Sequence, residues 1–163
     1  MKVRQATQDD LCAIAGLHVA SWRSAYAGLL PADYLELPVE RDLGALWTEL
    51  RPDDLVLVAC DADAIVGFVA FRPDTSEDGP LLDNLHVAPE RRGEGVGEFL
   101  MRASAAALRE IGEMRFWLTV IDENSGARRF YARMGGLEGP VFWEDLKGNP
   151  VRVRKVTWVD LPL

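Results

Sequence analysis

The chain has 163 residues, of which 48% are hydrophobic and 27% charged, so we expect a single folded domain over residues 1–163. Its formal net charge of −8 at pH 7 argues against a general affinity for nucleic acid or for an anionic membrane surface, whereas a cationic partner such as an amine is tolerated. No apolar run approaches the roughly 20 residues of a membrane span, and no apolar signal segment is present, so we expect a cytoplasmic protein.

The N-terminal third predicts a short strand followed by two helical segments. Residues 3–6 form the strand, and Thr7-Gln8-Asp9-Asp10 resembles a capping box ahead of a helix whose apolar stripe begins at Leu11. A second helical pattern runs from Pro31 to near Leu50. Trp22 and Tyr26 lie between the two patterns. Aromatic residues at helical spacing usually belong to a core, but this pair could equally form one wall of a substrate groove.

The rest of the chain predicts further strands interrupted by helices. The expected strands are 55–60, 64–72, 81–87, 115–120, 141–144 and 151–159, and the expected helices are 95–112 and 124–134. This order predicts an α+β fold of about seven strands with about four helices. The sheet should be mostly antiparallel and should gain a parallel pair where a strand, a helix and a strand follow one another. The two cysteines, Cys12 and Cys60, lie in apolar runs, and we expect both to be reduced and buried.

The turn after the strand 81–87 has the composition of an anion site. Gly93, Gly95 and Gly97 alternate with Glu94 and Val96, so the backbone can adopt positive φ and approach a ligand without interference from a Cβ atom. The helix that follows adds unpaired first-turn N–H groups and the positive end of its dipole, which favour a phosphate or pyrophosphate. The neighbouring pair Arg91-Arg92 adds two guanidinium groups.

Other phosphate-binding loops fit this turn less well. A dinucleotide-binding fingerprint needs its third glycine where Glu98 stands, and a Walker A loop needs a Gly-Lys-Ser/Thr ending that is absent. The run Arg92-Gly93-Glu94-Gly95-Val96-Gly97 instead resembles the acyl-CoA signature Gln/Arg-x-x-Gly-x-Gly/Ala of the GNAT N-acetyltransferase superfamily. The predicted order of elements is similar to the GNAT fold over essentially the whole chain. The segments 4–10 and 124–135 also resemble family segments.

This resemblance implies an acetyl-CoA site built from two parts of the chain. The residues from Arg92 to Gly97 would hold the pyrophosphate, and the strand end Leu85, His86 and Val87 would lie along the pantetheine arm. A backbone N–H near Leu85 would polarise the thioester carbonyl. Asn124 and Ala127 would line the cofactor channel on the helix 124–134. Asn124 taken alone indicates an N-cap, and the side chain of His86, on the opposite strand face from Asp83, is more typical of a structural role.

By the same resemblance, Tyr131 is the general acid that protonates the departing thiolate. Its residue type has an ordinary pKa of about 10, which is reasonably matched to a thiol of about 8.5. The general base is open, because Leu81 stands where several relatives have a glutamate. Asp83 aligns with a second base candidate of some relatives, and by strict strand alternation it shares a face with Val87. A solvent-facing aspartate with no catalytic role and an ordered water as base are the alternatives.

The resulting hypothesis is an acetyl-CoA-dependent N-acetyltransferase that moves an acetyl group directly to a primary amine of a small molecule or peptide in a ternary complex. Trp22 and Tyr26 are the candidate acceptor-binding residues, since aromatic walls suit apolar or cationic molecules. A noncatalytic acyl-CoA-binding or sensing domain is the alternative. No metal is expected, because His18 and His86 are the only histidines and no zinc-ligand spacing occurs. A homodimer is a family-level expectation.

Overall fold

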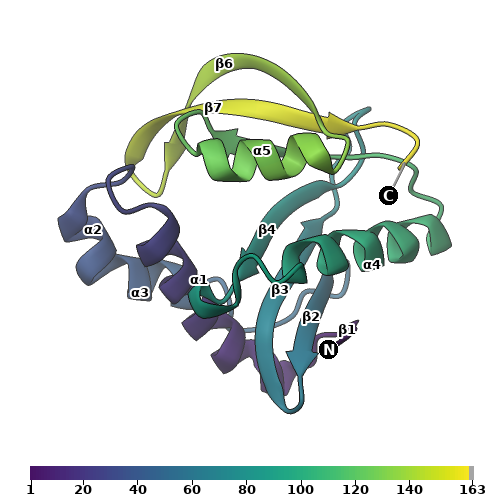
Figure 1. Ribbon diagram of the computed structural model, residues 1–163, viewed down its shortest axis with the longest axis horizontal. Coiled ribbons are helices and arrows are strands. Elements are labelled where there is room, and N and C mark those ends of the chain that lie inside the picture. The colour runs from purple at the N-terminus through teal and green to yellow at the C-terminus, as the bar shows by residue number, and fades with distance from the viewer. Residues whose placement is uncertain (162–163) are drawn as a thin grey trace.

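The computed structural model describes residues 1–161. Its strands are β1 (Lys2–Gln5), β2 (Leu55–Asp61), β3 (Ala64–Arg72), β4 (Leu81–Val87), β5 (Phe116–Ile121), β6 (Leu137–Leu146) and β7 (Asn149–Trp158), and its α-helices are α1 (Leu11–Ala25), α2 (Ala32–Glu36), α3 (Pro38–Gly44), α4 (Val96–Glu110) and α5 (Ser125–Arg133) (Figure 1). Short 3-10 turns, Gln8–Asp10 and Pro89–Arg91, precede α1 and α4. Within the described part of the chain, no helix has the length and apolar character needed to cross a membrane.

The seven strands form one mixed sheet in the order β1-β2-β3-β4-β5-β7-β6. All neighbouring pairs are antiparallel except β4 and β5, which run parallel and pair only at Leu81 and Trp117. The two strands therefore separate toward their carboxyl ends, and the sheet opens at its centre. The expected α+β fold with a mostly antiparallel sheet and one parallel pair is confirmed.

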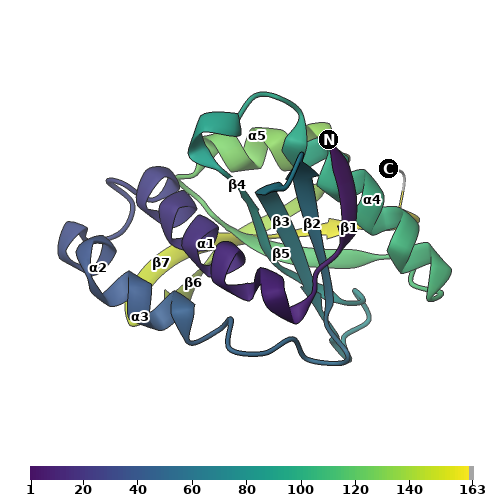
Figure 2. The ribbon, with the colours of Figure 1, turned by 90° about the horizontal axis from the view of Figure 1, so that it is seen from below.

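Helices cover both faces of the sheet. Figure 2 shows α4 and α5 on one side and α1 to α3 on the other. Alternation along β3 explains this arrangement, because Val69 packs in one core cluster with Leu100 of α4 while Phe68 packs in another with Ile14 of α1. A third cluster joins α1, α2 and α3 to Val153 of β7 and its neighbours.

Two segments differ in their bounds from the sequence prediction. The second helical pattern divides into α2 and α3 at Leu37, because Pro38 has no N–H to continue α2 and instead occupies the first turn of α3. Strand β6 begins at Leu137, and the β6–β7 turn is confined to Lys147 and Gly148. The sequence pattern did not reveal these extra strand residues, because many of their side chains are exposed and carry no clear alternation.

A β-bulge in β4 changes the expected facing of Asp83. Phe71 of β3 pairs with Leu82, and Ala70 pairs with Asn84, so Asp83 has no partner on β3. Strict alternation therefore does not hold between Asp83 and Val87, and the expectation that they share a face for this reason is wrong. The Asp83 carboxylate turns to Arg72, whose Nε lies 2.5 Å from its Oδ2.

The two cysteines have different environments. Both are free thiols, and Cys60 is buried in β2 as expected, whereas Cys12 is exposed. Leu11 and Ile14 set the inward face of α1, and Cys12 lies one residue, about 100°, away from Leu11 around the helix. The prediction of a buried Cys12 is therefore wrong.

Candidate active site

A cavity of about 830 Å³ occupies the place where β4 and β5 separate. It is lined from both faces of the sheet: Gly95, Gly97 and Tyr131 belong to α4, α5 and the turn on one side, and Trp22 and Tyr26 belong to α1 on the other. The cavity thus connects the two faces through the opening in the sheet. Every site residue predicted from the sequence lines it except Glu94, and these residues are Trp22, Tyr26, Asp83, Leu85, His86, Val87, Arg92, Gly93, Gly95, Val96, Gly97, Asn124, Ala127 and Tyr131.

The glycine turn presents open backbone to the cavity. Gly93 and Gly95 have φ of +83° and +82°, and a Cβ atom built at either position would meet nothing within 4 Å. Gly97 has a different role, because a Cβ atom there would lie 3.4 Å from the ring of Phe130 in α5. Two glycines therefore shape the turn, and the third allows α4 and α5 to approach each other.

The turn also has backbone donors without partners. In the described chain, the amides of Gly93, Gly95, Val96, Gly97 and Glu98 donate no hydrogen bond to a protein group, whereas the amide of Phe99 donates to the carbonyl of Gly95. These amides surround the N-terminus of α4, a helix of 15 residues. Such a set of oriented N–H groups fits a pyrophosphate, which supplies several anionic acceptor oxygens.

The two arginines of the turn are bound to protein groups. Arg91 forms ion pairs with Asp61 and Glu94, at 2.9 and 2.7 Å, so the Glu94 carboxylate is bound within the turn. Arg92 crosses to α1, where its Nη1 donates to Ser24 Oγ at 2.8 Å and its Nη2 to the Ser21 carbonyl at 3.2 Å. Arg92 still lines the cavity, and it connects the glycine turn to the helix that carries Trp22.

Helix α5 supplies the polar residues on the opposite wall. Asn124 is its N-cap, and its Oδ1 accepts a hydrogen bond of 3.2 Å from the amide of Ala127. Asn124 therefore has the capping role that its type indicates and lines the cavity at the same time. Tyr131 lies two turns further along the same face, in edge contact with Trp158 at 5.8 Å.

The pKa of Tyr131 differs strongly from the ordinary value of a tyrosine. The cavity walls remove water from its phenol, and this desolvation, followed by the nearby Tyr26, raises the pKa of Tyr131 well above its ordinary value. Burial also raises the pKa of Tyr26 to about 12. The expectation of an ordinary pKa for Tyr131 is wrong, because burial depends on packing that residue type does not reveal. Tyr131 is a protonated hydroxyl, able to donate, at any physiological pH.

His86 lies on the α1 face of β4 beside His18, which is fully buried. Its Nδ1 is 2.9 Å from Ser21 Oγ, and its ring centroid is 4.5 Å from that of His18. Burial, followed by the charge of Arg92, lowers the pKa of His86 to about 3. Burial, followed by His86, lowers the pKa of His18 to about 2. Both rings are neutral at pH 7, and Trp47 donates to His18 Nδ1 at 3.0 Å.

These two histidines predict acid sensitivity. Their folded pKa values lie below the unfolded value of about 6.5, so the unfolded chain takes up protons below this pH that the folded chain does not. We expect the free energy of unfolding to fall by about 2 kcal/mol per histidine between pH 7 and pH 5. Urea unfolding at the two pH values measures this change. His18→Gln should remove about half of it, and an undiminished drop in that variant would contradict the assignment.

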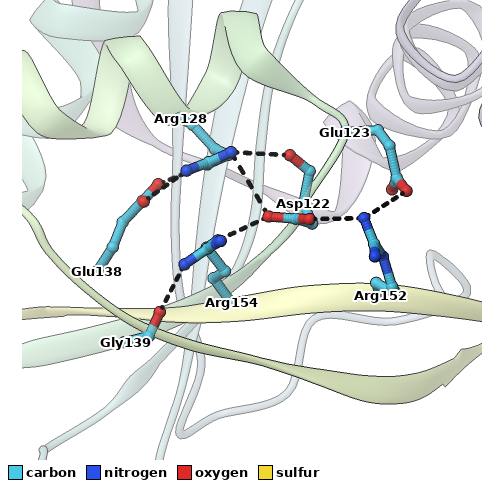
Figure 3. Close-up of polar contacts among 7 residues, drawn as sticks. All are labelled: Asp122, Glu123, Arg128, Glu138, Gly139, Arg152 and Arg154. Atoms are coloured by element: carbon cyan, nitrogen blue, oxygen red, sulfur yellow. Dashed lines mark hydrogen bonds and ion pairs between the residues drawn. The ribbon is translucent and has the colours of Figure 1, made fainter.

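A charged network holds the start of α5 against the sheet (Figure 3). Asp122, at the end of β5, accepts hydrogen bonds from Arg154 at 2.6 Å and Arg152 at 2.9 Å, both on β7. Its backbone carbonyl accepts from Arg128 of α5 at 3.0 Å, and Arg128 also pairs with Glu138 of β6 at 2.8 Å. Asp122 thus joins the end of β5 to β7 and α5, and Arg128 extends the network to β6, which fixes the segment that leads into Asn124.

We expect each acid of this network to stabilise the fold according to the number of ion pairs that it forms. Asp122→Asn removes the charge that three arginines share and should lower the melting temperature by several degrees. Among residues 1–161, the neighbouring Glu123 forms an ion pair with Arg152 only, at 3.3 Å, and is half exposed, so Glu123→Gln is a matched control with little effect. Thermal unfolding of both variants makes the comparison, and equal shifts would contradict it.

Some cavity residues were missed in the sequence. Thr119 of β5 and Glu144 of β6 both line the cavity, and the Thr119 hydroxyl donates to Glu144 Oε2 at 3.1 Å. Trp117 lines it too, at the point where β4 and β5 pair. No local signal marks these residues, because β7 separates β5 from β6 and the chain brings them together only through long-range pairing.

Comparisons with known proteins agree with this geometry. Residues 17–136 match the model of the Acetyltransferase (GNAT) family. An uncharacterized N-acetyltransferase of Bacillus subtilis, YuaI, is 29% identical over 126 residues, which are 75% of this chain and 72% of the relative. Streptothricin acetyltransferase of Streptomyces lavendulae is 37% identical over 92 residues, which are 56% of this chain and 48% of the relative. The PaiA N-acetyltransferase of Thermoplasma acidophilum, solved in complex with coenzyme A, superposes with a TM-score of 0.73 at 21% identity, over 94% of this chain and 96% of that one.

Proposed function

Since the chain belongs to the GNAT family and is an N-acetyltransferase, we propose that acetyl-CoA is its acyl donor and that the acetyl group passes directly to a primary amine in a ternary complex. The cavity that joins the two faces of the sheet carries this proposal. A donor bound on the α4 and α5 side and an acceptor bound on the α1 side would meet in the opening between β4 and β5. Direct transfer needs both substrates in place at once, and this cavity has room on both sides of the opening.

Each part of the donor has a fitting group in the cavity. The free amides of Gly93 and of Gly95 to Glu98 would hold the pyrophosphate, and the edge of β4 that separates from β5, at Leu85 and Val87, would bond the pantetheine arm. An N–H near Leu85 would polarise the thioester carbonyl. Asn124 and Ala127 would line the other side of the arm.

Tyr131 would protonate the thiolate that leaves. Its raised pKa keeps the proton on the phenol until the thiolate forms, and desolvation at the same place would also raise the proton affinity of the thiolate. The assignment of Asp83 as base stays a prediction. Its ion pair with Arg72 weighs against it, because a carboxylate that takes up a proton gives up that pair.

The acceptor would be the amine of a small molecule or peptide. Trp22 and Tyr26 stand in edge contact, 5.0 Å apart, on the acceptor side and would form an aromatic wall. The streptothricin acetyltransferase similarity supports a small-molecule amine, although this chain spans only about half of that relative's length.

The test is release of free thiol from acetyl-CoA in the presence of a panel of amines that includes polyamines, streptothricin-type antibiotics and peptides with free N-termini. We expect amine-dependent release by at least one class of acceptor and initial rates that require both substrates together. Protection of the fold by coenzyme A without thiol release for any amine would favour the alternative, a noncatalytic acyl-CoA-binding domain.

A further inference from the structure

Two carboxylates at the cavity have no cationic partner. Four acids line it, and Asp83 is bound by Arg72 at 2.5 Å while Glu98 is bound by Arg102 at 2.9 Å. Among residues 1–161, neither Glu144 nor Asp145 forms an ion pair. Neither of these two charges is neutralised by a cationic side chain of the described chain, and the arrangement of each side chain decides which of them is available to a ligand.

Strand register places Glu144 on the acceptor side of the sheet. Glu144 pairs with Val151 of β7, and Val151 shares a core cluster with Trp22 of α1. Residues directly opposite in an antiparallel pair point to the same face, so the Glu144 side chain lies on the face that α1 covers. Glu144 is half-buried, and its bond to Thr119 of β5 shows that it reaches back across β7 toward the opening of the sheet.

Asp145, the next residue, has a different arrangement. Consecutive residues of a strand point to opposite faces, so the Asp145 side chain faces away from that of Glu144. It is exposed, and its Oδ2 accepts a hydrogen bond of 2.9 Å from the amide of Gly148 in the β6–β7 turn. Asp145 is thus a turn-capping residue, whereas Glu144 is oriented by a hydroxyl inside the cavity.

We propose that Glu144 binds the ammonium group of the acceptor and takes its proton, an inference that rests on the proposed function. The ammonium gives one proton to the Glu144 carboxylate, and the freed nitrogen lone pair forms the C–N bond to the acetyl carbonyl carbon. The C–S bond breaks, and the thiolate takes the hydroxyl proton of Tyr131. Formation of the C–N bond leaves a cationic nitrogen that carries two protons, and one of them passes to the Tyr131 phenolate to give the neutral amide. Glu144 passes its proton to solvent, so one proton is released per turnover.

The charged groups around Glu144 leave its carboxylate free to bind the ammonium group and accept a proton. Tyr26, Asp83 and His86 line the same cavity, Lys155 of β7 pairs with Thr119, and Asp42 and Lys147 interact with each other electrostatically near the β6–β7 turn. Asp42 is bound by Arg41, and Lys155 pairs with Asp78, so their charges are compensated. His86 is neutral at pH 7, with its pKa lowered to about 3, and Tyr26 is protonated, with its pKa raised to about 12. Lys147 lies exposed in the turn.

The test compares Glu144→Gln with Asp145→Asn in the thiol-release assay, using the best amine of the panel. We expect Glu144→Gln to lower kcat/KM for the amine by about 10²–10³-fold at pH 7, and Asp145→Asn to change it by less than about twofold. Stabilisation by coenzyme A should be the same in both variants and the wild type. Glu144→Asp, which retains a carboxylate, should recover at least about tenfold of the loss.

A pH series separates proton transfer from a structural role. Raising the pH toward the amine pKa, about 10.4 for a lysine-type amine, supplies more neutral nucleophile, so the defect of Glu144→Gln should shrink steadily. A defect that is constant with pH, or full activity of Glu144→Gln, would overturn the proposal while leaving the acetyltransferase function intact. Absence of thiol release by the wild type with every amine would overturn both.

Discussion

Replacement of Tyr131 by phenylalanine should lower kcat by about 10²–10³-fold and change the affinity for acetyl-CoA by less than about threefold. The ring that packs at 5.8 Å against Trp158 is kept, so the wall of the cavity stays in place. What is lost is the hydroxyl, whose pKa is raised by desolvation and which therefore carries its proton through the whole physiological range. Thiol release measured at saturating amine gives kcat, and coenzyme A titration gives the affinity.

Tyr34→Phe is the matched control for this substitution. Tyr34 also has a raised pKa, of about 12, and donates to Asp42 at 3.1 Å, but it does not line the cavity. We expect removal of the Tyr34 hydroxyl to leave kcat and the affinity for acetyl-CoA unchanged. If Tyr131→Phe weakened coenzyme A binding as much as it slowed turnover, the hydroxyl would be a binding group and the acid role would be rejected.

Local chemistry made the donor half of the site predictable. Backbone conformation at Gly93 and Gly95 follows from the residue type, and the helix that begins at Val96 follows from apolar periodicity within a few residues. Asn124, Ala127 and Tyr131 occupy one face of α5 because spacings of three, four and seven residues place them there. Each inference needed only neighbours in the chain.

The acceptor half could not be predicted in this way. The bulge at Asp83 depends on how β3 and β4 pair, and the position of Glu144 depends on β7 lying between β5 and β6. Arg92 was assigned to the anion site by its position in the motif, but its guanidinium reaches Ser21 and Ser24 of α1. Each of these features depends on tertiary contacts between residues that lie far apart in the sequence, and so does the raised pKa of Tyr131.

Gly95→Val tests the proposed pyrophosphate site at the start of α4 and should weaken coenzyme A binding by about 10²-fold or more. Space is not the obstacle, because a Cβ atom at Gly95 would meet nothing within 4 Å. The backbone is the obstacle, since φ is +82° and a β-branched residue avoids this region at a cost of order 1–3 kcal/mol. The turn should relax, and the free amides around it would lose their common direction toward the pyrophosphate.

Gly112→Val separates this effect from a general loss of stability. Gly112 follows the other end of α4, has φ of +85°, and also has nothing within 4 Å of a Cβ atom, so the same strain is introduced on the same helix. Both variants should lose thermal stability to a similar extent, but only Gly95→Val should lose affinity in calorimetric titration with coenzyme A. Equal affinities would show that the donors at the start of α4 do not hold the diphosphate, because the two glycines differ in little except which end of the helix dipole they adjoin.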